Sequence, residues 1–217
     1  MSKLWAAVCS WGCLEESRGT EVESIGNIRR TEIIEAFFKI ISEKGLGKAT
    51  IREIADTAGC NHGLLHHYFS DKGAIIAASV EYAVNVYRED LLEGLEKFET
   101  ATEQLKFFIP RYLDIGRLNL EISQAWLDLY ALSKTEESIK KPVQECFREA
   151  REIVGEVIAR GIKKGEFRKV NPRVMATVIL GTLEGVTTLW VIDPEDTPVV
   201  EVGKLIEDLI RTYLVKK

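Results

Sequence analysis

The stretch T-I-R-E-I-A-D-T-A-G-C-N-H-G-L-L-H-H-Y-F (residues 50–69) carries two short helical patterns separated by a turn. Thr50 and Glu53 have the spacing of a capping box, in which the hydroxyl accepts a backbone N–H and the carboxylate reaches back. Gly59 suits the left-handed turn that ends such a helix, and Asn61 is placed to cap the next one. The stretch therefore predicts a helix-turn-helix whose second helix ends near Phe69.

This second helix is too short to be explained as a core element. About seven residues span only about 10 Å and bury little apolar surface by themselves. A helix of that size fits end-on into the DNA major groove, which is about 12 Å wide. We expect Leu65 and Phe69 to face the core. The opposite face carries small or polar residues, namely Asn61, His62, Gly63, His66 and His67.

Outside this motif the chain shows further helical patterns and almost no strand patterns. Its 217 residues are 46% hydrophobic and 29% charged, an ordinary balance for a globular protein. Apolar spacing and cap residues predict helices near 33–44, 71–97, 102–117, 120–132, 136–164, 172–190 and 198–215. Thr197 and Pro198 are expected to supply the cap and the first-turn proline of the last helix.

We therefore expect an all-α fold in three parts. An N-terminal extension (1–27) precedes a helix-turn-helix DNA-binding domain of three helices (28–75). A larger helical body (76–217) follows, and we expect it to bind an effector and to dimerise.

The charge of the chain restricts any nucleic-acid contact to a local patch. With 29 basic and 34 acidic residues, the net charge is 29 − 34 = −5, whereas a general nucleic-acid coat protein is strongly basic. All three histidines lie within residues 62–67, and imidazole changes charge near pH 6.5. We expect DNA affinity to be modest, sensitive to salt and stronger below about pH 6.5.

The run T-I-R-E-I-A-D-T-A-G-C-N-H-G-L-L-H-H-Y-F-S-D-K-G-A-I (50–75) resembles the DNA-binding head of TetR-type transcriptional regulators. The combination of I-A-x-x-A-G, G-L-L-x-H-Y-F and the following lysine carries the resemblance, which extends from Arg29 to about Ile75. The body is more loosely similar to betaine-type regulators, notably in A-W-L-D-L-Y (125–130) and G-E-F-R-K-V-N-P (165–172).

The resemblance implies roles for particular side chains at DNA. Three positions depart from the family pattern: Leu64 replaces a frequent Thr and is expected to meet a thymine methyl, His66 replaces a frequent Tyr, and Gly73 replaces a frequent Glu. Lys72 is placed to reach a phosphate beside the N–H groups of its helix. The expected DNA-binding set is Thr50, Arg52, Asn61, His62, Gly63, Leu64, His66, His67, Tyr68 and Lys72.

The two C-terminal helices predict an interface between two copies of the chain. Gly181 and Gly185 lie one turn apart in a segment that is apolar nearly all round, and Leu205 and Leu209 recur at helical spacing in the last helix. Their apolar surface exceeds what one body needs, so we expect a two-fold four-helix interface, with an internal core pair as the alternative. The resemblance also implies this homodimer, which sets two recognition helices about 34–36 Å apart.

The body also carries aromatic side chains and a carboxylate, Glu184, in its most apolar helix. A buried carboxylate needs a partner, either a cationic ligand or an arginine such as Arg111 or Arg117. The resemblance implies a pocket whose occupancy changes the spacing of the heads, although ordinary core packing is the alternative for each aromatic side chain. The candidate effector-binding residues are Phe107, Tyr112, Trp126, Tyr130, Phe147, Glu184 and Trp190.

Other classes of protein fit the residues less well. Cys60, His62 and His66 suggest a metal site, but zinc needs three or four well-placed ligands, so we expect neither a metal nor a cofactor. The chain has no P-loop and no G-x-S-x-G, and Gly63 stands where a metalloprotease has its Glu, so we expect no enzyme. The apolar segment 174–192 contains Glu184 and lacks basic flanks, so we expect a buried helix and not a membrane span.

The apolar start of the chain superficially resembles a signal peptide but has no clear cleavage site, and four scattered cysteines fit a reducing cytoplasm. The sequence thus predicts a cytoplasmic, homodimeric regulator, more a repressor than an activator. It binds a palindromic site on double-stranded DNA and is released by a small-molecule effector. The alternative is a helix-turn-helix protein whose body senses a metal or binds another protein.

Overall fold

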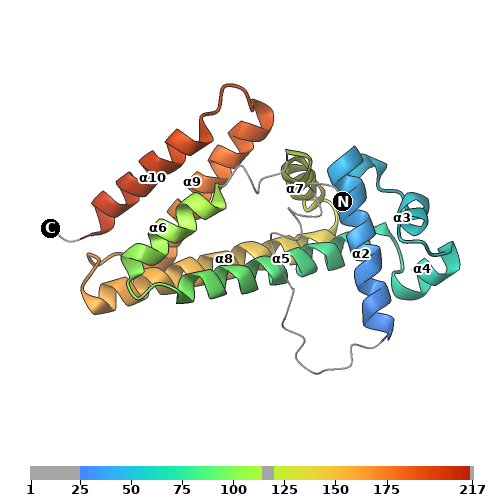
Figure 1. The fold of residues 1–217 in the computed structure, drawn as a ribbon, viewed down its shortest axis with the longest axis horizontal. Helices are drawn as coiled ribbons and strands as arrows, with labels where there is room; N and C mark the ends of the chain where they lie inside the picture. The colour runs from blue at the N-terminus through green and yellow to red at the C-terminus, as the bar shows by residue number, and fades with distance from the viewer. Residues whose placement is uncertain (1–24, 114–119, 216–217) are drawn as a thin grey trace. The chain divides into compact units, whose positions relative to one another are not determined.

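The computed structural model describes residues 25–113 and 120–215, and within these ranges the chain folds as packed helices (Figure 1). An isolated antiparallel bridge, Phe167 to Val215, adds the one extended contact recorded there. The elements are α2 (Ile25–Lys44), η1 (Leu46–Lys48), α3 (Ile51–Thr57), α4 (His62–Tyr68), α5 (Lys72–Glu96), α6 (Ala101–Tyr112), α7 (Leu120–Leu132), α8 (Glu137–Lys164), α9 (Pro172–Ile192) and α10 (Val199–Leu214). The predicted all-α fold is confirmed.

Local sequence signals set most of the helix ends. Glycines with positive φ, Gly45 at 77° and Gly165 at 80°, follow α2 and α8 directly, as expected for residues without a Cβ. Asn171 caps α9 by accepting N–H groups from Arg173 and Val174 at 3.1 and 3.2 Å. Most of the expected extension, residues 1–24, and the end of the predicted 102–117 helix lie outside the described residues, as does Arg117.

Two cap predictions are wrong. Thr50 does accept the Glu53 N–H, at 3.2 Å, but the Glu53 carboxylate forms an ion pair with Lys44 in the last turn of α2 and does not complete the capping box. Pro198 occupies the cap position of α10, not its first turn, and makes no side-chain cap. The N–H of Val199 bonds instead to the Thr197 carbonyl at 2.8 Å.

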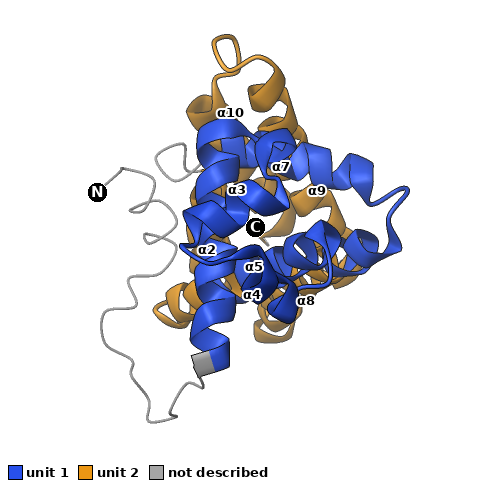
Figure 2. Cartoon of the chain, turned by 90° about the vertical axis from the view of Figure 1, so that its right-hand side faces the viewer, with its two compact units in different colours: residues 1–86, 119–144 blue, residues 87–118, 145–217 orange. Residues whose placement is uncertain are grey.

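The chain divides into two compact units, one of residues 1–86 and 119–144 and the other of residues 87–118 and 145–217 (Figure 2). In unit 1, α2 packs against α3, η1 and α7, and α3 packs against α4. In unit 2, α10 packs against α6 and α9. The unit boundaries fall inside α5 and α8, so α7 and the start of α8 belong with the head helices. The expected division at residue 75 stays a prediction.

Each unit has its own apolar core. Unit 1 buries, among others, Ile33, Ile40, Ile54, Leu65 and Ile75, and unit 2 buries Leu91, Ile109, Ile158, Phe167, Ile179 and Leu183. α9 is long and apolar enough to cross a membrane by length and composition alone, with 44% of its most apolar window buried. The other residues of α9 are exposed or half-buried, so within one chain the expectation of a buried helix is met in part.

Candidate nucleic-acid interface and effector region

The turn between α3 and α4 has the geometry of a helix-turn-helix. α3 ends at Thr57, Gly59 adopts a φ of 65°, and the Cys60 N–H bonds back to the Ala55 carbonyl at 3.0 Å. Asn61 then stands in extended conformation and accepts the Leu64 N–H at 2.8 Å, which caps α4. These bonds all lie between residues close in sequence, so the turn and the cap of α4 follow from the local sequence.

The two faces of α4 differ as predicted. Leu65 and Phe69 are buried, and they hold α4 on the core of unit 1. His62, Gly63, His66 and His67 are exposed, and Leu64 is 36% exposed. The rings of His62 and His66 lie 5.6 Å apart, edge to face, as expected for side chains one helical turn apart. α4 therefore presents an apolar side to the head and an imidazole-bearing side to solvent.

Several expected DNA contacts already have partners within the head. The side-chain carbonyl of Asn61 is used by the cap, so this residue has only its amide N–H groups to offer a base. Tyr68 is half-buried, with its ring 5.1 Å from that of His67. Arg52 is highly exposed, and its nearest ion-pair partner, Asp56, is 3.9 Å away. Such an exposed pair contributes little, so Arg52 is able to turn toward a phosphate.

Among the expected DNA contacts, Lys72 is the one whose side chain is least free to bind a phosphate. Its Nζ donates to the Leu46 carbonyl at 3.2 Å, and the side chain is half-buried. Burial lowers the pKa of Lys72, and the nearby carboxylate of Glu136 opposes this effect. The lysine thus ties the first turn of α5 to η1.

Lys48 is a further candidate contact that the sequence analysis did not single out. It lies in η1 with an exposed side chain, and its carbonyl accepts the Thr50 N–H at 2.8 Å, directly beside the α3 cap. In the sequence, Lys48 could have been found as a lysine two residues before the helix cap Thr50.

Among the described residues, no group of three or more His, Cys, Asp or Glu side chains is arranged to hold a metal ion.

The candidate effector residues fall into two groups. Phe107, Tyr112, Phe147, Glu184 and Trp190 belong to unit 2, whereas Trp126 and Tyr130 lie on α7 in unit 1. The Tyr112 hydroxyl donates to Glu184, so a tyrosine is one partner of this carboxylate. Arg111, which was considered as a partner of Glu184, pairs with Asp90, and its contact with Glu184 stays a prediction.

Unit 2 also holds a cluster of polar side chains around Tyr112 and Glu184. Its members are Tyr87, Arg88, Asp90, Arg111, Tyr112, Cys146, Glu149 and Glu184. Arg88 pairs with Glu149 at 3.6 Å. Burial raises the pKa of Tyr87 above its usual value, and the Arg111 charge opposes this shift. Burial, with the charges of Glu184 and Glu149, raises the pKa of Cys146 to about 12. The helices of unit 2 thus enclose charges as well as apolar side chains.

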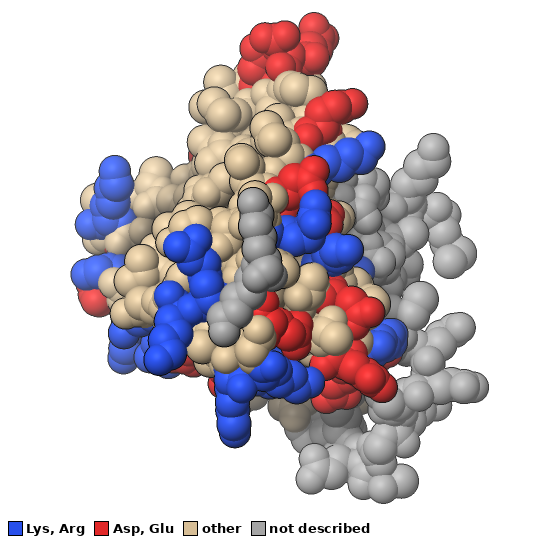
Figure 3. Space-filling model, turned by 90° about the vertical axis from the view of Figure 1, so that its left-hand side faces the viewer, with Lys and Arg blue, Asp and Glu red and all other residues tan. Residues whose placement is uncertain are grey.

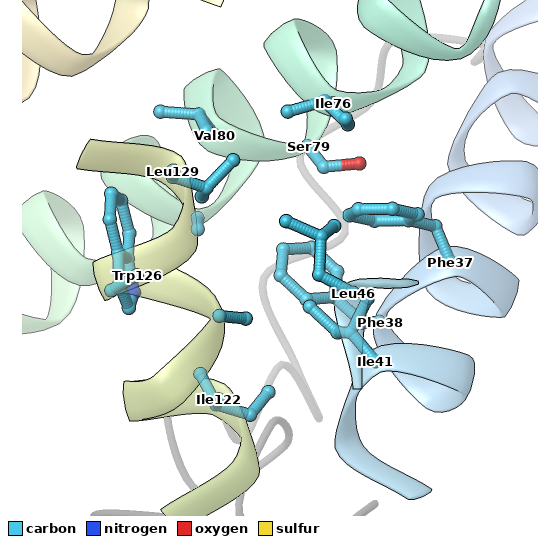
Figure 4. Close-up of a pocket in the computed structure, with 12 residues that line it drawn as sticks. Phe37, Phe38, Ile41, Leu46, Ile76, Ser79, Val80, Ile122, Trp126 and Leu129 are labelled. Carbon is cyan, nitrogen blue, oxygen red and sulfur yellow. The ribbon is translucent and has the colours of Figure 1, made fainter. Parts of the chain in front are cut away.

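Trp126 lines a small cavity inside unit 1, between α2, α5 and α7 (Figure 4). The cavity, of about 20 Å³, is lined almost entirely by apolar side chains such as Phe37, Phe38 and Leu46. Ser79 is the exception, since its side chain carries a hydroxyl. This buried hydroxyl has no hydrogen-bond partner among the described residues. A space of this size accommodates about one water molecule and no organic effector.

All four predicted dimerisation residues lie on the surface. Gly181 and Gly185 are exposed, with open space where a Cβ would be, and Leu205 and Leu209 are 58% and 61% exposed. Further exposed apolar side chains continue the same two helices: Val174, Val178, Leu189 and Ile192 on α9, and Val200 and Tyr213 on α10. Uncharged side chains also form a broad area on the face drawn in Figure 3, with charged side chains gathered along its borders.

The fold and the exposed face of α4 define a helix-turn-helix DNA-binding regulator. A family model described as "Bacterial regulatory proteins, tetR family" matches residues 33–79, and one described as "BetI-type transcriptional repressor, C-terminal" matches residues 101–215. The chain belongs to the TetR family of transcriptional regulators, with a BetI-type C-terminal part. It is a DNA-binding transcriptional repressor by its family.

Known proteins agree with this assignment. The fatty acid metabolism regulator protein of Bacillus subtilis is 23% identical over 182 residues, which cover 82% of this chain and 92% of the relative. A regulator from Saccharomonospora viridis in complex with choline superimposes with a TM-score of 0.78 at 20% identity, covering 87% and 98% of the two chains. The regulator FadR from Bacillus subtilis in complex with stearoyl-CoA gives 0.72 at 21% identity, covering 84% and 97%. These similarities confirm the fold.

Proposed function

We propose that the chain acts in the cytoplasm as a homodimer that places two copies of α4 in successive major grooves of a palindromic operator. The observation that carries the proposal is the two-sided construction of α4. Leu65 fixes one side to the core, and the other side offers His62, His66 and His67 to solvent. Because a helix of seven residues buries little surface, its exposed side is available for recognition.

The apolar surface of α9 and α10 supplies the second half of the proposal. On α9 the exposed positions 174, 178, 181, 185, 189 and 192 follow one another at intervals of three or four residues, so they share one face. The two glycines in that row permit close approach of a second helix. A copy of the same chain, related by two-fold symmetry, covers this face with its own α9 and α10.

Selection of bound fragments from the source genome tests the proposal, followed by footprinting of the recovered site. We expect an inverted repeat whose half-sites lie about one helical turn, 10–10.5 base pairs, apart or a multiple of that spacing. Arg52→Ala is expected to weaken binding about tenfold, whereas Arg148→Ala, at an exposed arginine of α8 in unit 2, leaves it unchanged. Equal effects of the two substitutions, or a single half-site, would contradict the proposed interface.

The effector is proposed to bind unit 2 beside Tyr112 and Glu184. The Glu184 carboxylate, half-buried within the most apolar helix, favours a cationic molecule because unlike charges attract more strongly there than in bulk water. The comparisons supply two probes, since choline is bound by one structural neighbour and stearoyl-CoA by another.

Thermal unfolding with each probe separates the two classes of effector. We expect choline to raise the unfolding temperature of the wild type and to have a smaller effect on Glu184→Gln. Glu156→Gln, at an exposed position of α8, is the matched control and should respond like the wild type. Stabilisation by stearoyl-CoA alone would assign an acyl effector instead.

A further inference from the structure

The turn that leads into α8 touches the first turn of α5. A Cβ built on Gly73 would lie 3.4 Å from Ser138 Oγ and 3.8 Å from Glu136 Oε2. Gly73 and Glu136 are distant in sequence but both belong to unit 1. The Glu136 carboxylate therefore lies beside the N-terminus of α5, where orphan N–H groups concentrate partial positive charge.

This contact explains why Gly73 departs from the family pattern. A glutamate at position 73, as the resemblance would suggest, would bring a second carboxylate to within reach of Glu136. The hypothetical Cβ is also only 3.1 Å from Asp71 Oδ1, which caps α5 by accepting the Ala74 N–H at 2.8 Å. Glycine leaves room for both acidic side chains beside one helix end.

Lys72 is the neighbouring cation. Its amine donates to the Leu46 carbonyl, and the Glu136 charge acts on it as well. The sequence analysis expects this same amine, together with the first turn of α5, to reach a DNA phosphate, and we include that contact in the proposed interface. A carboxylate and a phosphate are both anions, so they compete for the same cation and the same helix end.

We propose that Glu136 is a negative determinant of DNA affinity, because its carboxylate occupies the electrostatic site that a DNA phosphate needs at Lys72 and the start of α5. This inference rests on the proposed DNA interface, and within it on the contact of Lys72 with a phosphate. Glu136 directly precedes α8, which runs without interruption from Glu137 to Lys164 and passes from unit 1 into unit 2.

A pair of charge-removing variants tests the inference. Glu136→Gln removes the competing charge, and Glu137→Gln removes the same charge one residue later, where the carboxylate pairs with Lys140 at 3.0 Å. Both side chains are exposed, so both variants should fold like the wild type. The probe is a fluorescent random-sequence duplex of 30 base pairs at low salt, because a phosphate contact does not depend on base sequence.

We expect Glu136→Gln to tighten binding about threefold and Glu137→Gln to change it by less than about 1.5-fold. Lys72→Gln should weaken binding, and in that background the effect of Glu136→Gln should shrink, because only the start of α5 is then left to gain from the lost charge. Equal effects of the two glutamate variants, or a Glu136→Gln effect that is undiminished without Lys72, would overturn this inference but not the proposed function. Unchanged binding by Lys72→Gln would also remove Lys72 from the proposed interface.

Discussion

Leu209→Glu is expected to dissociate the proposed homodimer without unfolding the chain. Leu209 lies on α10 with 61% of its surface exposed, within the apolar face shared by α9 and α10. Leu and Glu have similar helix propensities, so the exchange costs an isolated chain little at an exposed helical position. Any large effect of this substitution must therefore come from a surface that covers Leu209 in solution.

The size of the effect follows from the exposed area. Fully burying a leucine is worth about 1.5–3 kcal/mol, so covering the exposed three-fifths of Leu209 contributes about 1–2 kcal/mol per copy. Two-fold symmetry doubles this to about 2–4 kcal/mol, and the glutamate adds the cost of removing a charge from water. With about 1.4 kcal/mol for each factor of ten, the dimer dissociation constant should rise at least about 100-fold.

Sedimentation velocity over a concentration series measures this constant directly. Leu92→Glu is the matched control, because Leu92 is a 42% exposed leucine on α5 and lies outside the face of α9 and α10. The control should sediment like the wild type, and both variants should keep the circular dichroism of the wild type. A wild type that is monomeric at micromolar concentration, or a Leu209→Glu variant that dimerises normally, would refute the reasoning.

Two further predictions concern stability and thiol reactivity. Ser79→Ala should stabilise the fold by about 1 kcal/mol in urea unfolding, because the buried Ser79 hydroxyl has no partner among the described residues; a loss of stability would indicate a bound water instead. Cys146, whose pKa is raised to about 12, should stay a protonated thiol and resist iodoacetamide at pH 8.5 in the native state, as peptide mapping can check.

Features of the fold that depend on neighbours along the chain were predictable from the sequence. Gly59 and Asn61 act as expected because a cap or a left-handed turn involves residues only two to five positions away. The division of α4 into a buried face and an exposed face was also predictable from the helical spacing of its residues. Glu53 behaves differently because its carboxylate finds Lys44, nine residues earlier, and this packing of α2 against α3 is absent from local sequence.

The candidate site was less predictable where side chains meet across long separations. Lys72 was expected to point to DNA, yet its amine bonds to Leu46, 26 residues away. Trp126 and Tyr112 are both aromatic residues in helical segments of the sequence. Trp126 lines an apolar cavity in unit 1, whereas Tyr112 bonds to Glu184 in unit 2. Aromatic composition indicates that a body has large side chains, but not which of them the packing brings together.

The charges of the head give a physical reason for the proposed dimer. Several of its basic side chains already have partners within the chain: Arg29 pairs with Glu32 at 2.6 Å, Lys44 pairs with Glu53, and Arg30 lies over the Phe69 ring at 4.6 Å. A phosphate must displace such partners, so each contact gains less than it would from an unpaired cation, and a single head should bind DNA weakly. Joining two heads makes the second contact intramolecular, which raises affinity by about 10²–10⁴ without any new contact. In the proposed dimer, the apolar face of α9 and α10 should therefore matter as much for operator binding as the residues of α4.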